Sequence, residues 1–176
     1  MEKTNGIASL ATWDIKDFID IEGIGEIKAI QLKCIAEISR RMVKTKLNMS
    51  NLFNDPTTVA KYYSQDLRYR DRECVVVVGM DNSGRLLGDE IISIGTAITS
   101  LLSPREVFKV AIKMGATCII LLHNHPSGNP VPSRTDIIST KEIVRLGHIM
   151  ELPIQDHIVI GDGTFFSMRK EGVVEF

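Results

Sequence analysis

The chain has 176 residues, of which 44% are hydrophobic and 24% charged, and its formal net charge is −1 at pH 7. This composition is ordinary for a globular protein, and the small net charge excludes the strong positive field that drives tight nucleic-acid binding. No apolar stretch approaches the roughly 20 residues that span a bilayer, and the N-terminus lacks the pattern of a signal peptide. We therefore expect a cytoplasmic protein with one α/β-type domain and a small accessory unit.

Residues 12–46 have the pattern of two helices on either side of a tight break. Residues 14–20 predict a short helix, Gly23 and Gly25 interrupt it, and apolar residues then recur at helical spacing. Residues 47–72 are polar, so we expect a linker over 49–56 with a helix after it. The expected domains are a helical segment over 1–48, the linker, and a second domain over 57–176.

From residue 73 onward, predicted strands and helices alternate. The β-branched run 74–79 predicts a buried strand, and a turn over 81–84 leads to an antiparallel partner reaching about Ile94. Ser103, Pro104 and Glu106 are typical of a helix start. A strand over 117–122, a helix over about 133–150 and a strand over 154–160 follow. The expected fold class is α+β with a mixed central sheet.

The chain has an odd number of cysteines, which are widely spaced and each lie in an apolar segment: Cys34, Cys74 and Cys118. This pattern favours reduced thiols in the core over disulfides or a cysteine zinc site.

The residues best suited to catalysis follow the strand predicted over 117–122. His123 and His125 are separated by one residue, so on a strand their side chains face the same side. A loop rich in proline and glycine then leads to a helix whose first turn carries Asp136. Two imidazoles and a carboxylate leave a fourth position open for water, which is a ligand set of catalytic zinc. Bound to zinc, that water has a pKa of about 7 and becomes a usable nucleophile.

A hydrolytic zinc site also needs a base outside the ligand set. Glu73 is the candidate, because it begins the first core strand and can sit at the sheet edge near the histidines. Ser133 could donate a hydrogen bond to the oxyanion of an attacked carbonyl. The alternative is that Ser133 and Asp136 only cap a helix. The two histidines favour the metal site, because burying them on one strand face without a common partner is costly.

The spacing of this cluster resembles the MPN, or JAMM, metalloprotease motif: His123-x-His125-Pro126, six residues, Ser133, two residues and Asp136. The resemblance implies an MPN/JAMM domain of the cytidine-deaminase-like fold, with a mixed sheet flanked by helices. It implies one Zn²⁺ per chain held by His123, His125 and Asp136. It further implies that Ser133 steadies the tetrahedral intermediate and that Glu73 activates water.

One position departs from the eukaryotic members of that family, which usually have Ser or Thr where this chain has Asn124. Asn124, the loop 126–133 and the segments 103–107 and 156–161 are together similar to the bacterial RadC subfamily. This resemblance covers nearly the whole chain. The HNH nucleases are a different class, because their three residues are scattered over a longer unit.

Residues 21–29 resemble the helix-hairpin-helix motif of non-specific DNA-binding proteins, and they precede the zinc domain as a small helical unit. The turn at Gly23 and Gly25 would expose backbone N–H groups to a phosphate. Basic residues on the following helix could add contacts: Lys28, Lys33, Arg40 and Arg41. Dissociation constants on the order of 10⁻⁴ to 10⁻⁶ M would result. The alternative is a packing element, because Glu22 and Glu26 flank the glycines and would repel phosphate.

Two functions therefore remain open. The first is a zinc-dependent hydrolase of peptide or isopeptide bonds acting on an unidentified protein or peptide, and the second is a non-catalytic DNA-associated repair or recombination protein. The filled ligand positions favour the enzyme. Two further histidines receive no role: Asp156 beside His157 favours a satisfied structural histidine, and His148 is expected to interact with a helix dipole.

Overall fold

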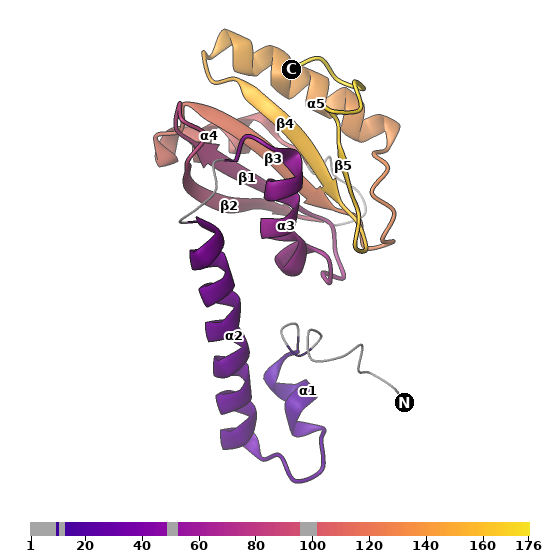
Figure 1. The fold of residues 1–176 in the computed structure, drawn as a ribbon. Helices are drawn as coiled ribbons and strands as arrows, with labels where there is room; N and C mark the ends of the chain where they lie inside the picture. Colours follow the sequence, from indigo (N-terminus) through magenta and orange to yellow (C-terminus); the bar gives the residue numbers. More distant parts are fainter. Residues whose placement is uncertain (1–9, 11–12, 49–52, 96–101) are drawn as a thin grey trace. The chain divides into compact units, whose positions relative to one another are not determined.

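The structure is a computed structural model that describes residues 10, 13–48, 53–95 and 102–176, without the side chains of 40, 41 and 43–48. The chain divides into two compact units, Met1–Ser50 and Asn51–Phe176; Figure 1 shows the elements of each. In the part of the chain that is described, no helix combines the length and the apolar character needed to cross a bilayer.

The described residues of the first unit form the helices α1 (Ile15–Ile19) and α2 (Glu26–Asn48). The turn between them passes through Gly23, whose φ of 84° lies in the left-handed region that glycine adopts without strain. Phe18 of α1 and Ala29 of α2 are buried. Cys34 is exposed, whereas Cys74 and Cys118 of the second unit are buried, and all three are free thiols. The expectation of a core thiol is therefore wrong for Cys34, because helical spacing of apolar residues does not by itself bury a face.

The second unit contains the mixed sheet that the sequence predicts. Its elements are α3 (Pro56–Leu67), β1 (Cys74–Met80), β2 (Leu86–Ile94), α4 (Pro104–Met114), β3 (Cys118–Asn124), α5 (Arg134–Ile149), β4 (Ile154–Ile160) and β5 (Phe165–Ser167). The strand order is β2-β1-β3-β4-β5. In this strand order, β3 and β4 pair in parallel, and the other described neighbours are antiparallel. The α+β class is confirmed, and β5 is an edge strand that the sequence did not predict.

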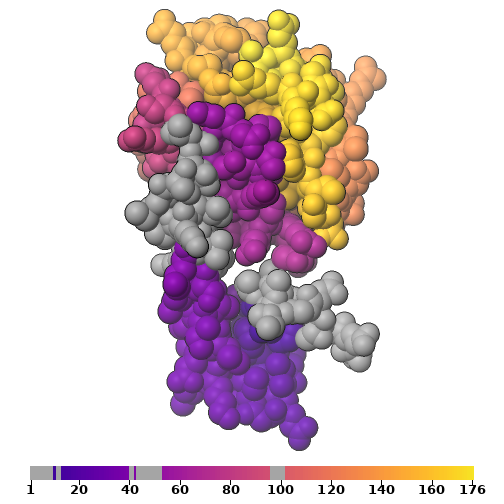
Figure 2. Space-filling view, in the orientation of Figure 1, coloured from indigo at the N-terminus to yellow at the C-terminus, as the bar shows by residue number. Residues whose placement is uncertain are grey.

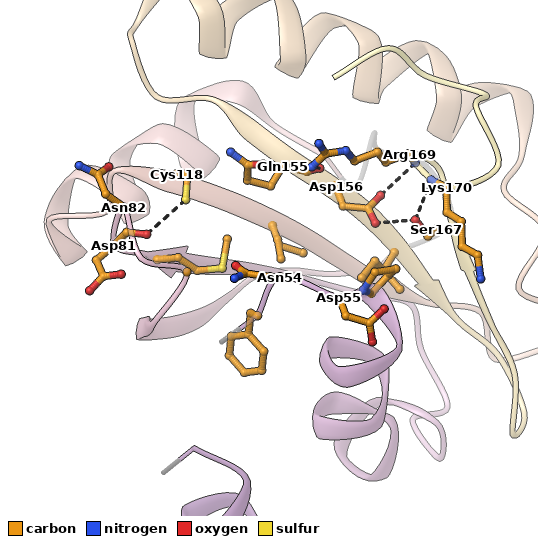
Figure 3. A pocket seen from close by; sticks show the side chains of 16 residues that line it. Asn54, Asp55, Asp81, Asn82, Cys118, Gln155, Asp156, Ser167, Arg169 and Lys170 are labelled. Atoms are coloured by element: carbon orange, nitrogen blue, oxygen red, sulfur yellow. Dashed lines mark hydrogen bonds between the residues drawn. The ribbon is translucent and has the colours of Figure 1, made fainter. Parts of the chain in front are cut away.

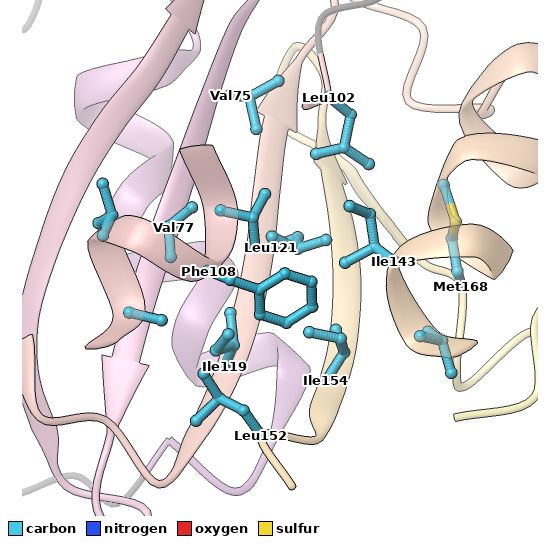
Figure 4. Packing of buried hydrophobic residues seen from close by; sticks show 14 of the residues in the cluster. Val75, Val77, Leu102, Phe108, Ile119, Leu121, Ile143, Leu152, Ile154 and Met168 are labelled. Atoms are coloured by element: carbon cyan, nitrogen blue, oxygen red, sulfur yellow. The ribbon is translucent and has the colours of Figure 1, made fainter. Parts of the chain in front are cut away.

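Helices cover both faces of this sheet. On one face, Leu121 of β3 packs in a single cluster with Phe108 of α4 and Ile143 of α5 (Figure 4). On the other, α3 lies beside β4, so that segments far apart in the sequence form one surface (Figure 2). Burial on both sides explains why every residue of β1 and β3 is buried and why β1, and β3 as far as Leu122, are continuously apolar. The packed strand β3 ends at the candidate site and holds its backbone in place.

Candidate metal centre

The end of β3 and the start of α5 bring three ligand groups together. His123 belongs to β3, and His125 follows the strand, where its N–H donates to the Ile160 carbonyl of β4 at 3.0 Å. The two Nε2 atoms lie 3.0 Å apart. Oδ2 of Asp136 lies 3.8 Å from Nε2 of His123 and 3.7 Å from Nε2 of His125. Tetrahedral zinc with bonds of about 2 Å separates its ligand atoms by about 3.3 Å, so the three atoms are spaced for one ion.

The position of the ring proton of His125 follows from its neighbour. Its Nδ1 lies 2.7 Å from the carbonyl oxygen of Asn129. Because a carbonyl only accepts, Nδ1 carries the proton and Nε2 of a neutral His125 keeps a lone pair. That lone pair is directed toward Nε2 of His123.

The three ligand groups affect one another's charge. Burial lowers the pKa of His123 to about 4, and the Asp136 carboxylate offsets only part of this effect. The same carboxylate raises the pKa of His125, against the opposing effect of burial. Burial alone would raise the pKa of Asp136, but its interactions with His125 and Ser133 hold it well below its usual range. At neutral pH, His123 is therefore neutral and Asp136 is ionised, which are the states that metal binding requires.

Ser133 is the N-cap residue of α5 and forms a reciprocal capping box with Asp136. The Ser133 hydroxyl donates to Oδ2 of Asp136 at 2.6 Å and accepts from the Asp136 N–H at 3.1 Å. The Ser133 N–H donates to the same Oδ2 at 2.7 Å. Capping and metal binding, posed as alternatives by the sequence, are thus compatible here, because the cap holds the carboxylate toward the histidines.

Glu73 lies immediately before β1, the strand that pairs with β3. The antiparallel register pairs Val75 with His123, and extending it by two residues places Glu73 opposite His125 and on the same face. Consistently, the Glu73 carboxylate makes a small contribution to the raised pKa of His125, after the larger effect of Asp136. The candidate base therefore lies within electrostatic reach of the ligand set but is not among the three clustered ligands.

His157 is buried directly behind His123. Its Nε2 lies 2.8 Å from Nδ1 of His123, and its Nδ1 lies 2.6 Å from Oγ1 of Thr140. Burial holds the pKa of His157 well below its usual range. The interpretation that Asp156 satisfies this histidine is wrong for the imidazole, because Asp156 accepts from the backbone N–H of His157 at 2.7 Å. Neighbouring residues on a strand face opposite sides of the sheet.

Sequence reasoning missed Thr140, although a signal was present. Thr140 lies four residues after Asp136, which places both on the same side of α5. Its hydroxyl donates to the Asp136 carbonyl at 2.6 Å.

Comparison with known proteins assigns the second unit to a family. The family model described as RadC-like JAB domain matches residues 53–173. The chain belongs to the RadC family. It is 38% identical to a UPF0758 protein of Desulforamulus reducens over 168 aligned residues. The alignment covers 96% of this chain and 74% of that protein. The chain is 37% identical over 171 residues to one of Caldanaerobacter subterraneus subsp. tengcongensis, covering 97% and 73%.

In this RadC-family chain, a cavity of about 650 Å³ lies between the start of α3 and the sheet (Figure 3). Ile120 and Ile158 line it, and they alternate along their strands with Leu121 and His157, whose side chains face the other side. The cavity is therefore separated from the metal centre by the sheet. The Asp156 carboxylate in its wall accepts hydrogen bonds from one hydroxyl and two backbone N–H groups.

Two lysines that could contact a phosphate donate hydrogen bonds within the first unit. Nζ of Lys28 donates to the Gly23 carbonyl at 3.2 Å, and Nζ of Lys33 donates to the Trp13 carbonyl at 2.5 Å. A Cβ added at Gly25 would meet open space. The side chains of Arg40 and Arg41, and residues 49–52 of the expected linker, lie outside the described residues. The lysines thus stabilise the hairpin, and a phosphate would compete with its carbonyls for them.

Proposed function

We propose that this RadC-family protein is a zinc-dependent hydrolase of amide bonds, of metallopeptidase or isopeptidase type. The observation that carries the proposal is the convergence of two imidazole Nε2 atoms, 3.0 Å apart, with the carboxylate of Asp136. Two nitrogen lone pairs at that distance repel each other, so a positive charge between them, a proton or a metal ion, stabilises the arrangement.

The donor set fits zinc. Two nitrogen ligands and one oxygen ligand leave a fourth tetrahedral position open, as in catalytic sites. The hydrogen bond from Nδ1 of His125 to the Asn129 carbonyl is the kind of outer contact that orients a ligating histidine. When bound, zinc supplies a water of pKa about 7 and polarises a carbonyl oxygen.

The remaining chemistry belongs to the side chains around the ligands. Glu73 accepts the proton of the attacking water and returns it to the leaving amine, a role suited to a carboxylate outside the ligand set. The Ser133 hydroxyl orients Asp136 in the structure. To stabilise the oxyanion, that hydroxyl must turn from Oδ2 of Asp136 toward the attacked carbonyl, while the Ser133 N–H keeps its own bond to Oδ2.

The first test is metal content. Protein purified without chelator should hold about one zinc per chain, and His123→Ala or Asp136→Ala should abolish binding. Glu73→Gln should leave zinc in place, because Glu73 is not among the clustered ligands. Absence of zinc in the wild type, together with no uptake from added Zn²⁺, would overturn the proposal.

The second test is hydrolysis. The probes are a library of internally quenched peptides and a set of peptides joined through a lysine side-chain amide. Zinc-loaded wild type should cleave members of at least one set, and zinc-loaded Glu73→Gln should be slower by about 10²- to 10⁴-fold. Equal rates for the two proteins would show that Glu73 is not the base, and cleavage by His123→Ala would indicate a contaminating protease.

A further inference from the structure

A chain of buried contacts joins two of the candidate ligands from behind. Nδ1 of His123 lies 2.8 Å from Nε2 of His157, whose Nδ1 lies 2.6 Å from the hydroxyl oxygen of Thr140. That hydroxyl also lies 2.6 Å from the backbone carbonyl of Asp136. His157 is 2% exposed and Thr140 0%. The contacts therefore run from β3 through β4 to α5, away from solvent.

The direction of each hydrogen bond in this series follows from the Asp136 carbonyl at which the series ends. The Asp136 carbonyl can only accept, so the single hydroxyl proton of Thr140 points to it. Thr140 is then the acceptor in its contact with His157, and Nδ1 of His157 carries the proton. A neutral imidazole has one ring proton, so Nε2 of His157 accepts from His123.

We propose that Thr140 and His157 are positioning residues that hold His123 in the tautomer protonated on Nδ1, with its Nε2 lone pair directed at the metal. The inference rests on the proposed zinc site and specifies how one of its ligands is prepared. The opposite tautomer would place a proton on Nε2 of His123, at the point where the metal belongs.

The arrangement differs from the usual outer contact of a ligating histidine, in which the second ring nitrogen donates to a carboxylate, a carbonyl or water. Here the acceptor is another imidazole, and its own orientation depends on a hydroxyl. Because Thr140 is bonded to the carbonyl of Asp136, the same hydroxyl links the position of His123 to the helix turn that carries the third ligand. Loss of this one hydroxyl should therefore weaken metal binding.

The direct test is the ring tautomer in metal-free wild-type protein, measured by long-range ¹H–¹⁵N NMR correlation at neutral pH. His123 and His157 should both be protonated on Nδ1. A proton on Nε2 of either ring would overturn the proposal. This measurement needs neither zinc nor a variant, so its outcome is separate from that of the proposed hydrolase.

The second test compares zinc affinities by competition with a chromogenic chelator. Thr140→Val keeps the size of the side chain but removes the hydroxyl, and should weaken zinc binding about 10- to 100-fold. Thr140→Ser should restore most of the affinity. Thr135→Val makes the same chemical change at an exposed position of the same helix and should have little effect.

Each result of this comparison has a definite meaning. Wild-type affinity in folded Thr140→Val would overturn the role of the hydroxyl, as would failure of Thr140→Ser to recover affinity. A wild type that binds no zinc would refute the hydrolase, while the tautomers would still decide the hydrogen-bond direction. If Thr140→Val does not fold, two measurements still decide the proposal. They are the ring tautomers of the wild type and the zinc affinity of Thr140→Ser, which we expect to be near that of the wild type.

Discussion

The side chain of Asn124 bonds to both residues that flank Glu73. Its Oδ1 accepts from the Cys74 N–H at 2.8 Å, and its Nδ2 donates to the Arg72 carbonyl at 3.2 Å. Asn124 is 1% exposed, so these bonds form without competition from water. The amide therefore holds the backbone on either side of the candidate base, which gives a structural reason for an asparagine between the two histidines.

Replacing Asn124 by serine should separate catalysis from metal binding. A hydroxyl is too short to reach both Cys74 and Arg72, so at least one of the two hydrogen bonds to the backbone is lost. We expect a loss of about 1–3 kcal/mol in the free energy of unfolding. We also expect at least about a tenfold fall in hydrolysis of any peptide that the wild type cleaves, because Glu73 is no longer held in place.

The metal should remain in Asn124→Ser, since no ligand is altered, and zinc analysis checks this. Asn82→Ser is the matched control, because Asn82 is an exposed asparagine in the turn before β2. Wild-type activity in Asn124→Ser would show that Glu73 does not depend on this amide.

Gly161 allows the loop behind the metal centre to approach β4. A Cβ at this position would lie 2.4 Å from the Gly128 carbonyl oxygen and 2.9 Å from Cδ of Pro130. Backbone atoms cannot rotate away, so Gly161→Ala should push the loop outward and displace the Asn129 carbonyl that orients His125. We expect a loss of about 1–3 kcal/mol in stability and weaker zinc binding. Thermal unfolding and chelator competition measure the two effects.

Val131→Ala provides a control in the same loop, because Val131 is exposed and shortening its apolar side chain creates no contact and removes no hydrogen bond. It should match the wild type in both measurements. Tight zinc binding by Gly161→Ala would mean that the loop can move without disturbing His125.

The parts of the site that the sequence predicted depend on local geometry. A strand places residues two apart on one side, and a helix start brings residues three apart into a capping box. Ser133 and Asp136 follow the second rule. His123 lies in β3, and His125, just past its end, still pairs with the Ile160 carbonyl of β4, so the pair comes close to the first rule. Their convergence depends on tertiary structure: the strand, loop and helix pattern makes it possible, and the family spacing favours it.

The parts that were missed depend on long-range register and helix rotation. His157 meets His123 because β3 and β4 are parallel with a register shift near Ile119, and Thr140 meets His157 because α5 packs on that face with one particular rotation. No local pattern encodes either relation. The exposed Cys34 was mispredicted for a related reason. A helical pattern predicts which side of a helix is apolar, but it does not predict whether another element covers that side.

The pH dependence of zinc binding should reveal a single competing proton. The Asp136 carboxylate raises the pKa of His125 above its ordinary 6.5, whereas burial lowers that of His123 to about 4. Between pH 6.5 and 5, only His125 must lose a proton to bind the metal, so apparent zinc affinity should fall about tenfold per pH unit. Chelator competition across this range measures the slope. A slope of about a hundredfold per unit would show that both histidines titrate there.

Acid should destabilise the metal-free protein in a window set by His123. Its pKa is about 4 when folded and near 6.5 when unfolded, so between these values the unfolded chain binds more protons and stability falls as pH falls. The full shift corresponds to about 3 kcal/mol. His157, whose pKa is also lowered by burial, acts in the same direction.

The other two candidate ligands, Asp136 and His125, do not contribute to this loss of stability as the pH falls. Asp136, with its pKa well below the usual range, stays ionised throughout the window, and the raised pKa of His125 gives a stabilising contribution that is lost only above pH 6.5. Urea unfolding in excess chelator at pH 6.5 and 4.5 should therefore show a smaller loss in His123→Gln than in wild type. His148→Gln, at an exposed histidine of α5, should keep the full loss. Equal losses in wild type and His123→Gln would mean that folding does not lower the pKa of His123, so that a proton competes with the metal for its Nε2 over this pH range.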